Sequence, residues 1–528
     1  MRIRGAPALA EYPWVTPVRR VWLLTPIITA ASVMLAGAPA TAAPLEPTSS
    51  TPSSAIAPAS TVPCSSIDLA LDGVTCGRLS VPVDWFDASN TATGSIAYAI
   101  HRATAKKKLG TLTFNPGGPG GSGLSTLEVL LGKDPMRPWQ RLPKSVVEQF
   151  DIVAWDPRGV GASTPALRDC GFANPSYGAL PATGPVDWLT ATQAYSDSLA
   201  AILAACAAAN PGVADKLGTA FVIRDLEALR KALGVSQWTY WGMSYGTQIG
   251  MAYAQAYPSR LRALLLDGTV PVNSTFTQRA AMQTWGRLYA LDVFARSYGK
   301  GFAAKVDRVV AEFDKRAGDI QGESFDRWST VASWLGLLNA QFNYPLIKKR
   351  VDYWYDAFFT SQTPSTPPVV RAAEPDLSGR YLTFMVNCSD IAERPSVESI
   401  ARFAQSAADA GLTVAGRMVI ERGIVCAGLP EGFGRPLPEI TAPLRLPHSA
   451  VVLNSVGDPF TQWLGAQQTA GFIQGARLIS YMSSQHVTYR QVPAPCVDRP
   501  VTTYLLTVTR PASDLQCNFA VGRDIVIG

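Results

Sequence analysis

Two kinds of hydrophobic pattern alternate along most of this chain. Short runs of β-branched and aromatic residues are typical of buried strands, while residues 225–234 place their leucines at helical intervals and end at a glycine. Strands that alternate with helices predict an α/β fold, with a mostly parallel sheet flanked by helices on both faces. The strand-like runs lie at 79–83, 94–100, 112–115, 150–155, 237–241, 261–267, 450–455 and 476–481.

The pattern changes between residues 272 and 437. Helical runs replace the strands there, for example at 302–316 and 397–410. We therefore expect an inserted helical cap, residues 273–437. The α/β core would then consist of two parts, residues 64–272 and residues 438–528.

The first 63 residues carry a different signal. Residues 1–42 contain four arginines, then an apolar run at 21–36, then small residues, which is the pattern of an export signal. The apolar run is too short, and too interrupted by Pro26, for a membrane span. Residues 43–63 are rich in Pro, Ser and Thr, as linkers are. We expect a secreted or cell-envelope protein, without a stable membrane span once the signal is removed.

Composition narrows the function classes. The 528 residues are 47% hydrophobic and 16% charged, which is typical of a globular protein with a sizeable core. Part of the net charge of +6 comes from the N-terminal arginines, and no basic run is interleaved with aromatic residues, so nucleic acid is not an expected partner. Eight cysteines in an exported chain, none in C-x-x-C spacing, and only three histidines favour disulfides over metal ligation. We expect no metal and no cofactor.

The candidate nucleophile is Ser244. It is the centre of Gly-Met-Ser-Tyr-Gly at 242–246, which follows a strand-like run and precedes a helical one. Strand, Gly-x-Ser-x-Gly and helix in this order form the nucleophile elbow of the α/β-hydrolase fold, in which a sharp turn presents the serine hydroxyl above the sheet. A chance match of five common residues is the alternative interpretation, and the other motifs argue against it.

Such a serine needs a histidine base oriented by a carboxylate, and in this fold the chain order is serine, acid, histidine. Only His448 and His486 follow Ser244 in the sequence. His448 precedes a strand and is expected at the opposite end of the sheet, whereas His486 directly follows the last strand-like run. Asp458 lies in the loop after the preceding strand, held by the rigid proline that follows it. We predict a triad of Ser244, Asp458 and His486.

The oxyanion formed during attack needs backbone N–H donors. One is predicted at Tyr245, directly after the nucleophile. The other is expected from the glycine-rich loop at 115–123, with Gly118 as the best candidate. This loop lacks the Lys-Ser/Thr of a P-loop and the spacing of a dinucleotide-binding motif, so a phosphate cradle is the less favoured interpretation.

Four motifs together resemble one family. Residues 115–123 (Asn-Pro-Gly-Gly-Pro-Gly-Gly-Ser-Gly), 156–163 (Asp-Pro-Arg-Gly-Val-Gly-Ala-Ser), 242–246 and 458–461 (Asp-Pro-Phe-Thr) look like those of secreted tripeptidyl aminopeptidases, in the proline-iminopeptidase branch of the α/β-hydrolases. The similarity extends from about Cys64 to Cys517. It implies a serine exopeptidase that removes short peptides from free N-termini through an acyl-enzyme, under a helical cap. It also implies four neighbouring disulfides, Cys64–Cys76, Cys170–Cys206, Cys388–Cys426 and Cys496–Cys517.

The chain departs from this family in two places. Gln485 and Val487 flank His486 where the family usually has glycines, and Gln462 stands in place of a frequent proline. The flanking residues are expected to narrow the site near the leaving group, which affects substrate preference and not the triad.

An exopeptidase must also recognise the free α-amine, and burying an ammonium without a partner is costly. Asp267 ends the strand beside the elbow strand, and Asp390 lies close to Cys388 in the expected cap, so both are candidates for this role. A structural role in the turn at 268–269 is the competing interpretation for Asp267.

Peptides are therefore the expected substrates, and the sequence predicts no oligomeric state. Two other functions remain open. A carboxylesterase or lipase would use the same triad and oxyanion hole. A non-catalytic envelope binding protein with a degenerate hydrolase fold is the alternative from another class, and the intact triad argues against it.

Overall fold

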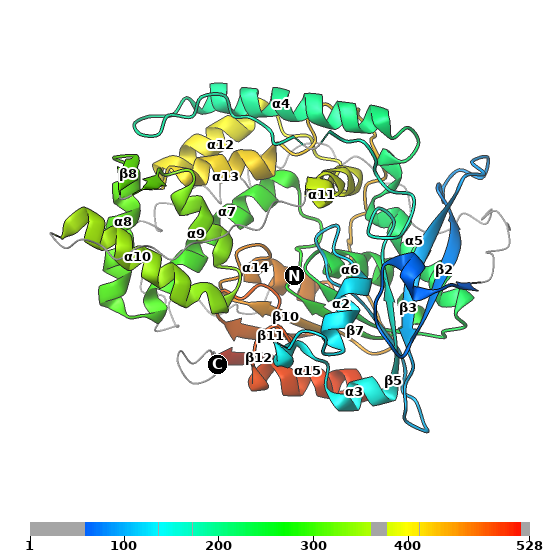
Figure 1. Cartoon of the computed structure of the whole chain (residues 1–528). Coiled ribbons are helices and arrows are strands. Elements are labelled where there is room, and N and C mark those ends of the chain that lie inside the picture. Colours follow the sequence, from blue (N-terminus) through cyan, green and yellow to red (C-terminus); the bar gives the residue numbers. More distant parts are fainter. Residues whose placement is uncertain are drawn as a thin grey trace.

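The computed structural model describes residues 59–518, except residues 136, 172, 321, 361–376 and 411. The expected export signal at 1–42 and most of the expected linker at 43–63 lie outside the described residues. The described chain forms a ten-stranded sheet flanked by helices, with a further group of helices gathered on one side (Figure 1). None of the helices in this part of the chain has both the length and the apolar character that a membrane span needs.

The sheet is mostly parallel. Its strands are β1 Ser60–Thr61, β2 Val74–Pro82, β3 Thr93–His101, β4 Gly110–Asn115, β5 Phe150–Trp155, β6 Trp238–Met243, β7 Leu261–Asp267, β10 Val451–Ser455, β11 Arg477–Met482 and β12 Leu515–Asn518. Their order is β1-β2-β3-β5-β4-β6-β7-β10-β11-β12. The pairs β1–β2, β2–β3 and β3–β5 are antiparallel, and every pair from β5 to β12 is parallel. The predicted α/β class is confirmed.

Helices cover both faces of the sheet. The core helices are α2 Gly123–Leu130, α3 Lys144–Gln149, α5 Thr219–Ala232, α6 Tyr245–Ala256, α14 Trp463–Gly471 and α15 Pro495–Thr507. Along β7, Leu264 and Leu266 belong to one hydrophobic core and Ala263 and Leu265 to the other, because successive side chains of a strand point to opposite faces. α2, α3 and α15 contribute to the second core, and α5, α6 and α14 to the first. Every residue of β6 is therefore buried.

The cap consists mainly of helices from the segment in which helical patterns were predicted. Its elements are α7 Phe276–Ser297, α8 Lys300–Phe313, β8 Gly318–Ile320, β9 Glu323–Phe325, α9 Thr330–Leu337, α10 Tyr344–Phe359, α11 Leu377–Asp390, α12 Val397–Asp409 and α13 Val414–Gly423. A long helix from the expected core segment, α4 (Trp188–Ala209), joins them (Figure 1). The ring of Trp188 lies 6.3 Å from that of Trp328, and a Cβ on Gly416 would lie 2.4 Å from Trp188. The cap therefore draws on two separate stretches of the chain.

Four disulfides connect segments that are near in sequence. They join Cys64 to Cys76, Cys170 to Cys206, Cys388 to Cys426 and Cys496 to Cys517. These are the four pairs that the family resemblance implies, and no cysteine in the described part is free. Such cross-links stabilise mainly by restricting the unfolded chain.

Candidate active site

Ser244 lies at a sharp turn between β6 and α6. Its backbone has φ 53° and ψ −124°, a strained conformation that non-glycine residues adopt mainly where function requires it. The flanking glycines make this turn possible, because a Cβ on Gly242 would lie 2.4 Å from the Gly246 oxygen, and a Cβ on Gly246 would lie 2.4 Å from the Asn115 oxygen. The turn has the geometry of the elbow that the sequence motif predicts.

His486 and Asp458 are hydrogen-bonded to each other. The Nδ1 atom of His486 lies 2.9 Å from Oδ2 and 3.0 Å from Oδ1 of Asp458. The backbone N–H groups of Phe460 and Thr461 each donate to Asp458 Oδ1 over 2.9 Å, and the Thr461 hydroxyl donates to Oδ2 over 2.9 Å. These donors hold the buried carboxylate in place, and the carboxylate in turn orients the imidazole.

The electrostatics of this pair favour a protonated imidazole. Burial lowers the pKa of His486, but the charge of Asp458 and the hydrogen bond to it raise the pKa above its ordinary value. The side chain is only 16% exposed. A histidine with these properties is suited to accept a proton and to hold it while an intermediate exists.

The serine and histidine loops meet at Asp267. The Ser244 N–H donates to the backbone oxygen of Asp267 over 2.9 Å. The carboxylate oxygens of Asp267 accept the N–H groups of Thr488 and Tyr489, each over 2.9 Å. A Cβ on Gly268 would lie 3.4 Å from Cε1 of His486. One residue thus holds both candidate catalytic loops at the same edge of the sheet.

This geometry argues against Asp267 as the amine-binding residue. Its side chain is fully buried, and both oxygens are already bonded to backbone N–H groups. Burial raises its pKa to about 7, which also disfavours a free carboxylate that faces substrate. The position of Asp267 at a strand end pointed to the site, but its contacts with residues more than 200 positions away were not visible in the sequence.

Asp390 is also engaged by the protein. Its carboxylate accepts the N–H of Thr219 over 2.7 Å, the hydroxyl of Thr219 over 2.6 Å and the side-chain amide of Gln248 over 2.7 Å. The Thr219 hydroxyl is in turn 2.7 Å from the phenol oxygen of Tyr245. Burial raises the pKa of Asp390 to about 7. The structure therefore places Asp390 against α5 and α6, where its carboxylate is buried and bonded to the protein.

The glycine loop packs directly on the elbow. A Cβ on Gly117 would lie 2.8 Å from the Ser244 Cβ and 3.0 Å from the Tyr245 nitrogen, so only a glycine fits there. The N–H groups of Gly118 and Tyr245 donate to no acceptor within the described chain. Two free donors beside a serine are what an oxyanion hole requires.

The motif at 156–163 supports this loop from behind. Asp156 accepts a hydrogen bond from the Ser122 hydroxyl over 2.8 Å and one from the Leu124 N–H over 3.2 Å. Arg158 forms a fully buried ion pair with Asp225 over 2.7 Å. Sequence reasoning recognised the motif but not this supporting role, which depends on contacts between distant segments.

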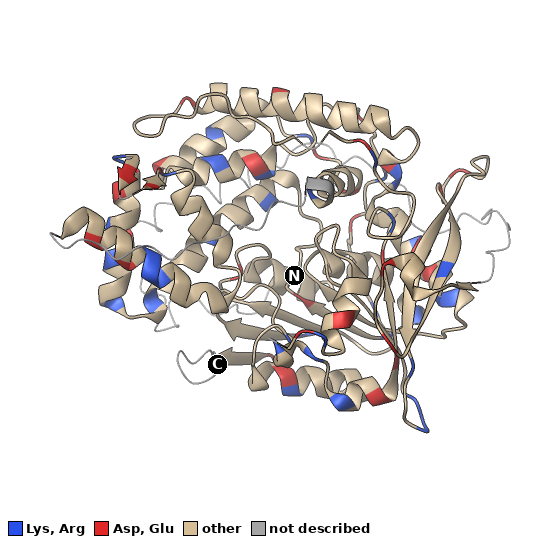
Figure 2. Cartoon of the chain, in the orientation of Figure 1, with Lys and Arg blue, Asp and Glu red and all other residues tan. Residues whose placement is uncertain are grey.

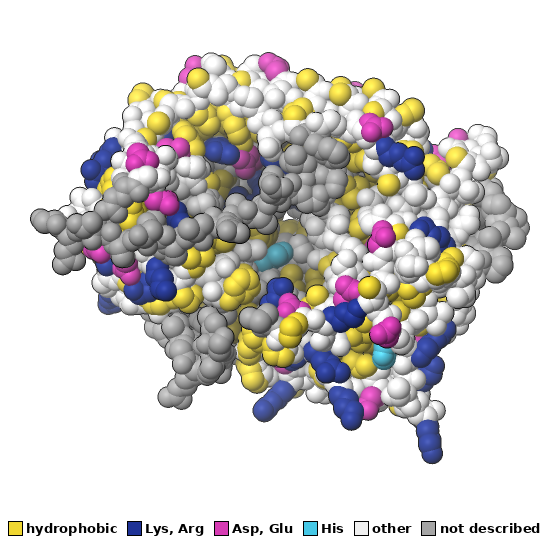
Figure 3. Space-filling model, viewed as in Figure 1, with side chains coloured by type: hydrophobic (Ala, Val, Ile, Leu, Met, Phe, Trp, Pro, Cys, Tyr) yellow, Lys and Arg dark blue, Asp and Glu magenta, His cyan; other side chains and the backbone are white. Residues whose placement is uncertain are grey.

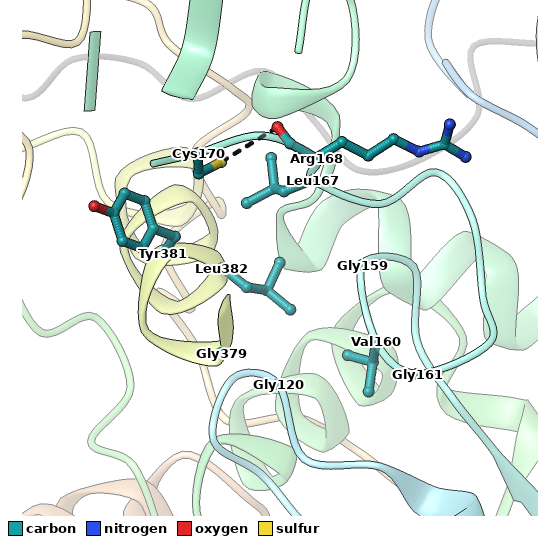
Figure 4. A pocket seen from close by; sticks show the side chains of 10 residues that line it. All are labelled: Gly120, Gly159, Val160, Gly161, Leu167, Arg168, Cys170, Gly379, Tyr381 and Leu382. Atoms are coloured by element: carbon teal, nitrogen blue, oxygen red, sulfur yellow. Dashed lines mark hydrogen bonds between the residues drawn. The ribbon is translucent and has the colours of Figure 1, made fainter. Parts of the chain in front are cut away.

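A pocket of about 150 Å³ lies beside the glycine loop (Figure 4). It is enclosed by three glycines, by Leu167 and Cys170, and by the first turns of α11. Its lining residues are Gly120, Gly159, Val160, Gly161, Leu167, Arg168, Cys170, Gly379, Tyr381 and Leu382. Gly120 of the glycine loop lines the pocket, whereas Ser244 and His486 do not.

The space-filling view shows a hollow between cap and core (Figure 3). A histidine side chain is visible at its floor, and basic and acidic side chains lie on its wall. Among the described residues no three His, Cys, Asp or Glu side chains cluster as metal ligands do.

Two family models match the chain. Residues 110–316 match the alpha/beta hydrolase fold family, and residues 412–517 match the family described as TAP-like protein. The first match contains Ser244, and the second contains Asp458 and His486.

Several relatives match most of the chain. Serine protease Hip1 of Mycobacterium tuberculosis is 28% identical over 473 residues, which cover 84% of this chain and 87% of that protein. Tripeptidyl aminopeptidase of Streptomyces lividans is 26% identical over 478 residues, which cover 84% and 83%. Carboxylesterase B of Mycobacterium tuberculosis is 28% identical over 473 residues, which cover 84% and 86%. The names of these relatives include a protease, an aminopeptidase and an esterase.

Proposed function

We propose that this chain, whose sequence matches the alpha/beta hydrolase fold family and the TAP-like family, is an exported serine exopeptidase that releases di- or tripeptides from free N-termini. The observation that carries the proposal is the strained Ser244 elbow together with the His486–Asp458 pair, since Asp267 is bonded both to the serine turn and to the loop that follows His486. The similarity to a tripeptidyl aminopeptidase over 84% of the chain supports the substrate class.

The reaction proceeds in two halves. The Ser244 hydroxyl attacks the peptide carbonyl while His486 Nε2 accepts its proton, and Asp458 stabilises the resulting imidazolium. The N–H groups of Tyr245 and Gly118 bind the oxyanion. His486 then gives the proton to the leaving amine, the C–N bond breaks, and the acyl-enzyme remains. Water, deprotonated by His486, attacks the ester and releases the short peptide as a carboxylic acid.

The cap supports an exopeptidase over an endopeptidase. Helices α7, α11 and α13 lie over the carboxyl ends of the strands that carry the site (Figure 1). A site under such a cap admits the end of a chain more readily than its middle. Asp267 and Asp390 are both buried and hydrogen-bonded, so neither is assigned to the substrate amine.

The decisive experiment compares one chromogenic tripeptide with its N-acetylated form. We expect kcat/KM for the free amine to exceed that for the blocked form by at least about tenfold, because an aminopeptidase site must pair the buried ammonium with an acceptor, and acetylation removes the charge that this acceptor binds. Equal rates would reject an aminopeptidase.

Ser244→Ala is the matched loss-of-function variant. It should lose covalent labelling by a fluorophosphonate and about a million-fold in turnover, because the hydroxyl carries the covalent step. Retention of even a tenth of the activity would show that another residue is the nucleophile.

A carboxylesterase is the second candidate. The specific observation in its favour is the relative named carboxylesterase B, which is as similar to this chain as the Hip1 protease. The same triad would cleave an ester by the steps given above. Rapid turnover of 4-nitrophenyl esters together with no cleavage of either tripeptide would favour this function.

A further inference from the structure

Two helices of the cap carry a cluster of charges that the reaction does not use. We call it the cap arginine cluster. It consists of Arg287 on α7 and of Arg417, Glu421 and Arg422 on α13. Figure 2 shows acidic and basic segments of α13 next to a basic segment of α7. The cluster comes from two neighbouring helices of the cap, and all four side chains are half-buried.

The single carboxylate of the cluster is already occupied. Oε1 of Glu421 accepts the Tyr177 hydroxyl over 2.6 Å and Nε of Arg417 over 3.1 Å. The charges of Arg417, Arg422 and Arg287 keep the pKa of Glu421 below its ordinary value despite burial. One carboxylate therefore faces three guanidinium groups, and two positive charges remain uncompensated.

Arg287 has no polar partner within the described chain. Its Nε atom is buried without an acceptor, and the Nε atom of Arg422 is in the same situation. Burial and the positive charge of Arg422 lower the pKa of Arg287 to about 9. Half-buried charges of the same sign are costly to keep together, and proteins normally pair them. An anion that enters the hollow would supply the missing charge.

The location of Arg287 relates the cluster to the reaction. Its guanidinium lies 5.1 Å from the ring centroid of Phe460, and that ring lies 5.1 Å from the ring of His486. The guanidinium is thus no more than about 10 Å from the imidazole. An extended peptide advances roughly 3.3–3.6 Å per residue, so this span corresponds to two or three residues of substrate.

We propose that Arg287 and Arg422 bind a carboxylate of the substrate, two or three residues from the bond that is cleaved. This subsite deepens the proposed function, on which it rests, and makes acidic short peptides the preferred substrates. Guanidinium groups bind carboxylates through two parallel hydrogen bonds, which a neutral amide cannot replace. The carboxylate can come from an Asp or Glu side chain or from the C-terminus of a short peptide.

The first test uses substrates that differ in charge and hardly in shape. Chromogenic tripeptides with Glu or Gln at the second or the third residue from the chromophore are compared in wild type, Arg287→Gln and Arg422→Gln. We expect wild type to prefer Glu at one of these positions by about 10- to 100-fold in kcat/KM, the range of a charge-assisted hydrogen bond. Each variant should lose most of this preference and change less than about threefold on the Gln substrate.

Arg296→Gln is the matched control, because it makes the same substitution on α7 at an exposed arginine paired with Asp292. It should keep the preference for Glu. Arg287→Lys retains the positive charge but not the planar guanidinium that can bind both carboxylate oxygens. This variant should keep part of the preference for Glu. Fluorophosphonate labelling at the wild-type rate shows that a variant is folded. Wild type without any preference for Glu, or variants that keep it, would overturn the proposal.

A second comparison separates the two sources of carboxylate. Unmodified tetrapeptides and pentapeptides with a free or an amidated C-terminus are followed by mass spectrometry. Preference for the free C-terminus that disappears in Arg287→Gln assigns the subsite to the chain end. Indifference to amidation, combined with a preference for Glu, assigns it to an acidic side chain.

An ester pair keeps this proposal independent of peptidase activity. The mono-4-nitrophenyl ester of suberic acid carries, at the far end of its eight-carbon chain, a carboxylate that 4-nitrophenyl octanoate lacks. If wild type prefers the acidic ester and Arg287→Gln does not, while no peptide is cleaved, the subsite stands and the exopeptidase fails. If peptides are cleaved and neither acidic peptides nor acidic esters are preferred, the exopeptidase stands and the subsite fails.

Discussion

Asp267 shows how a carboxylate can serve the site without contacting substrate. Its backbone oxygen holds the Ser244 turn, and its side chain holds the loop that follows His486. All three oxygen atoms of this residue are engaged in fixing one loop to the other. Its contribution to the reaction is therefore one of position, and small displacements of reacting groups are costly to the rate.

Asp267→Asn should separate this positioning role from amine recognition. The amide can accept only one of the two backbone N–H groups, which leaves the other buried without an acceptor and costs about 1–3 kcal/mol of stability. We expect kcat to fall by about 10- to 100-fold with KM little changed, measured on a free-amine tripeptide. Asp292→Asn on the cap surface is the control. A variant with normal kcat that accepts acetylated peptides would restore Asp267 as the amine site.

The His486–Asp458 pair makes a prediction about pH. The carboxylate raises the pKa of His486 above 6.5, and the neutral imidazole is the base. We therefore expect kcat/KM to rise with pH, and we expect the midpoint of this rise to lie above pH 6.5. Asp458→Asn removes the charge, so its residual activity should have a lower midpoint and be reduced on the order of 10⁴-fold. Profiles of kcat/KM against pH for a neutral substrate measure both effects. An unchanged or higher midpoint in the variant would contradict the assigned pair.

At the scale of elements, local pattern predicted much of the core. The strand-like runs at 150–155 and 261–267 coincide with β5 and β7, and the run at 476–481 differs from β11 by one residue at each end. Most residues of these strands are buried on both faces, so their sequences are mainly apolar and are visible without the fold. The candidate triad was predicted for a related reason, since its three residues directly follow such strands in the sequence.

Long-range packing was not predictable in the same way. Helix α4 follows the first strands of the core in sequence, yet it packs on the cap. The carboxylates of Asp267 and Asp390 were expected near substrate, but they bond to groups 221 and 171 residues away along the chain. No local pattern records such pairings, because they depend on how distant elements come together.

The glycines of the elbow give a prediction at the element scale. Gly246→Ala would place a Cβ 2.4 Å from the Asn115 oxygen, so α6 must move away from β4. We expect unfolding in urea to show a loss of about 1–3 kcal/mol, as overpacking costs, and fluorophosphonate labelling to slow. Gly301→Ala makes the same change in α8, where the added Cβ would meet no neighbouring atom within 4 Å. This control should raise the free energy of unfolding by up to about 1 kcal/mol. Equal effects of the two substitutions would contradict the close packing of the elbow.

At the scale of the whole molecule, one buried network joins the cap to the core. Arg279 of α7 donates to Gln248 of α6 over 2.7 Å and to Asn387 of α11 over 3.2 Å. Gln248 donates in turn to Asp390, which also binds Thr219. Burial lowers the pKa of Arg279 to about 10, and the charge of Asp390 opposes this shift. The nucleophile helix and two cap helices therefore share one charge-compensated cluster.

Breaking this network should loosen the cap. Arg279→Gln breaks the hydrogen bonds to Gln248 and Asn387 and removes the positive charge that favours the buried carboxylate of Asp390, which should cost about 1–3 kcal/mol. We expect faster hydrogen exchange in α7 and α11, and a larger rise in KM for tripeptides than for a small 4-nitrophenyl ester, since only the longer substrate depends on the cap.

The double variant Arg279→Gln/Asp390→Asn should recover part of the stability that Arg279→Gln loses, because it also removes the buried carboxylate charge. Arg308→Gln, a surface change in α8, is the control for exchange and kinetics. Two results would show that the network does not couple the cap to α6. One is hydrogen exchange in α7 and α11 at the wild-type rate in Arg279→Gln. The other is a loss of stability in the double variant that equals the sum of the losses in the two single variants.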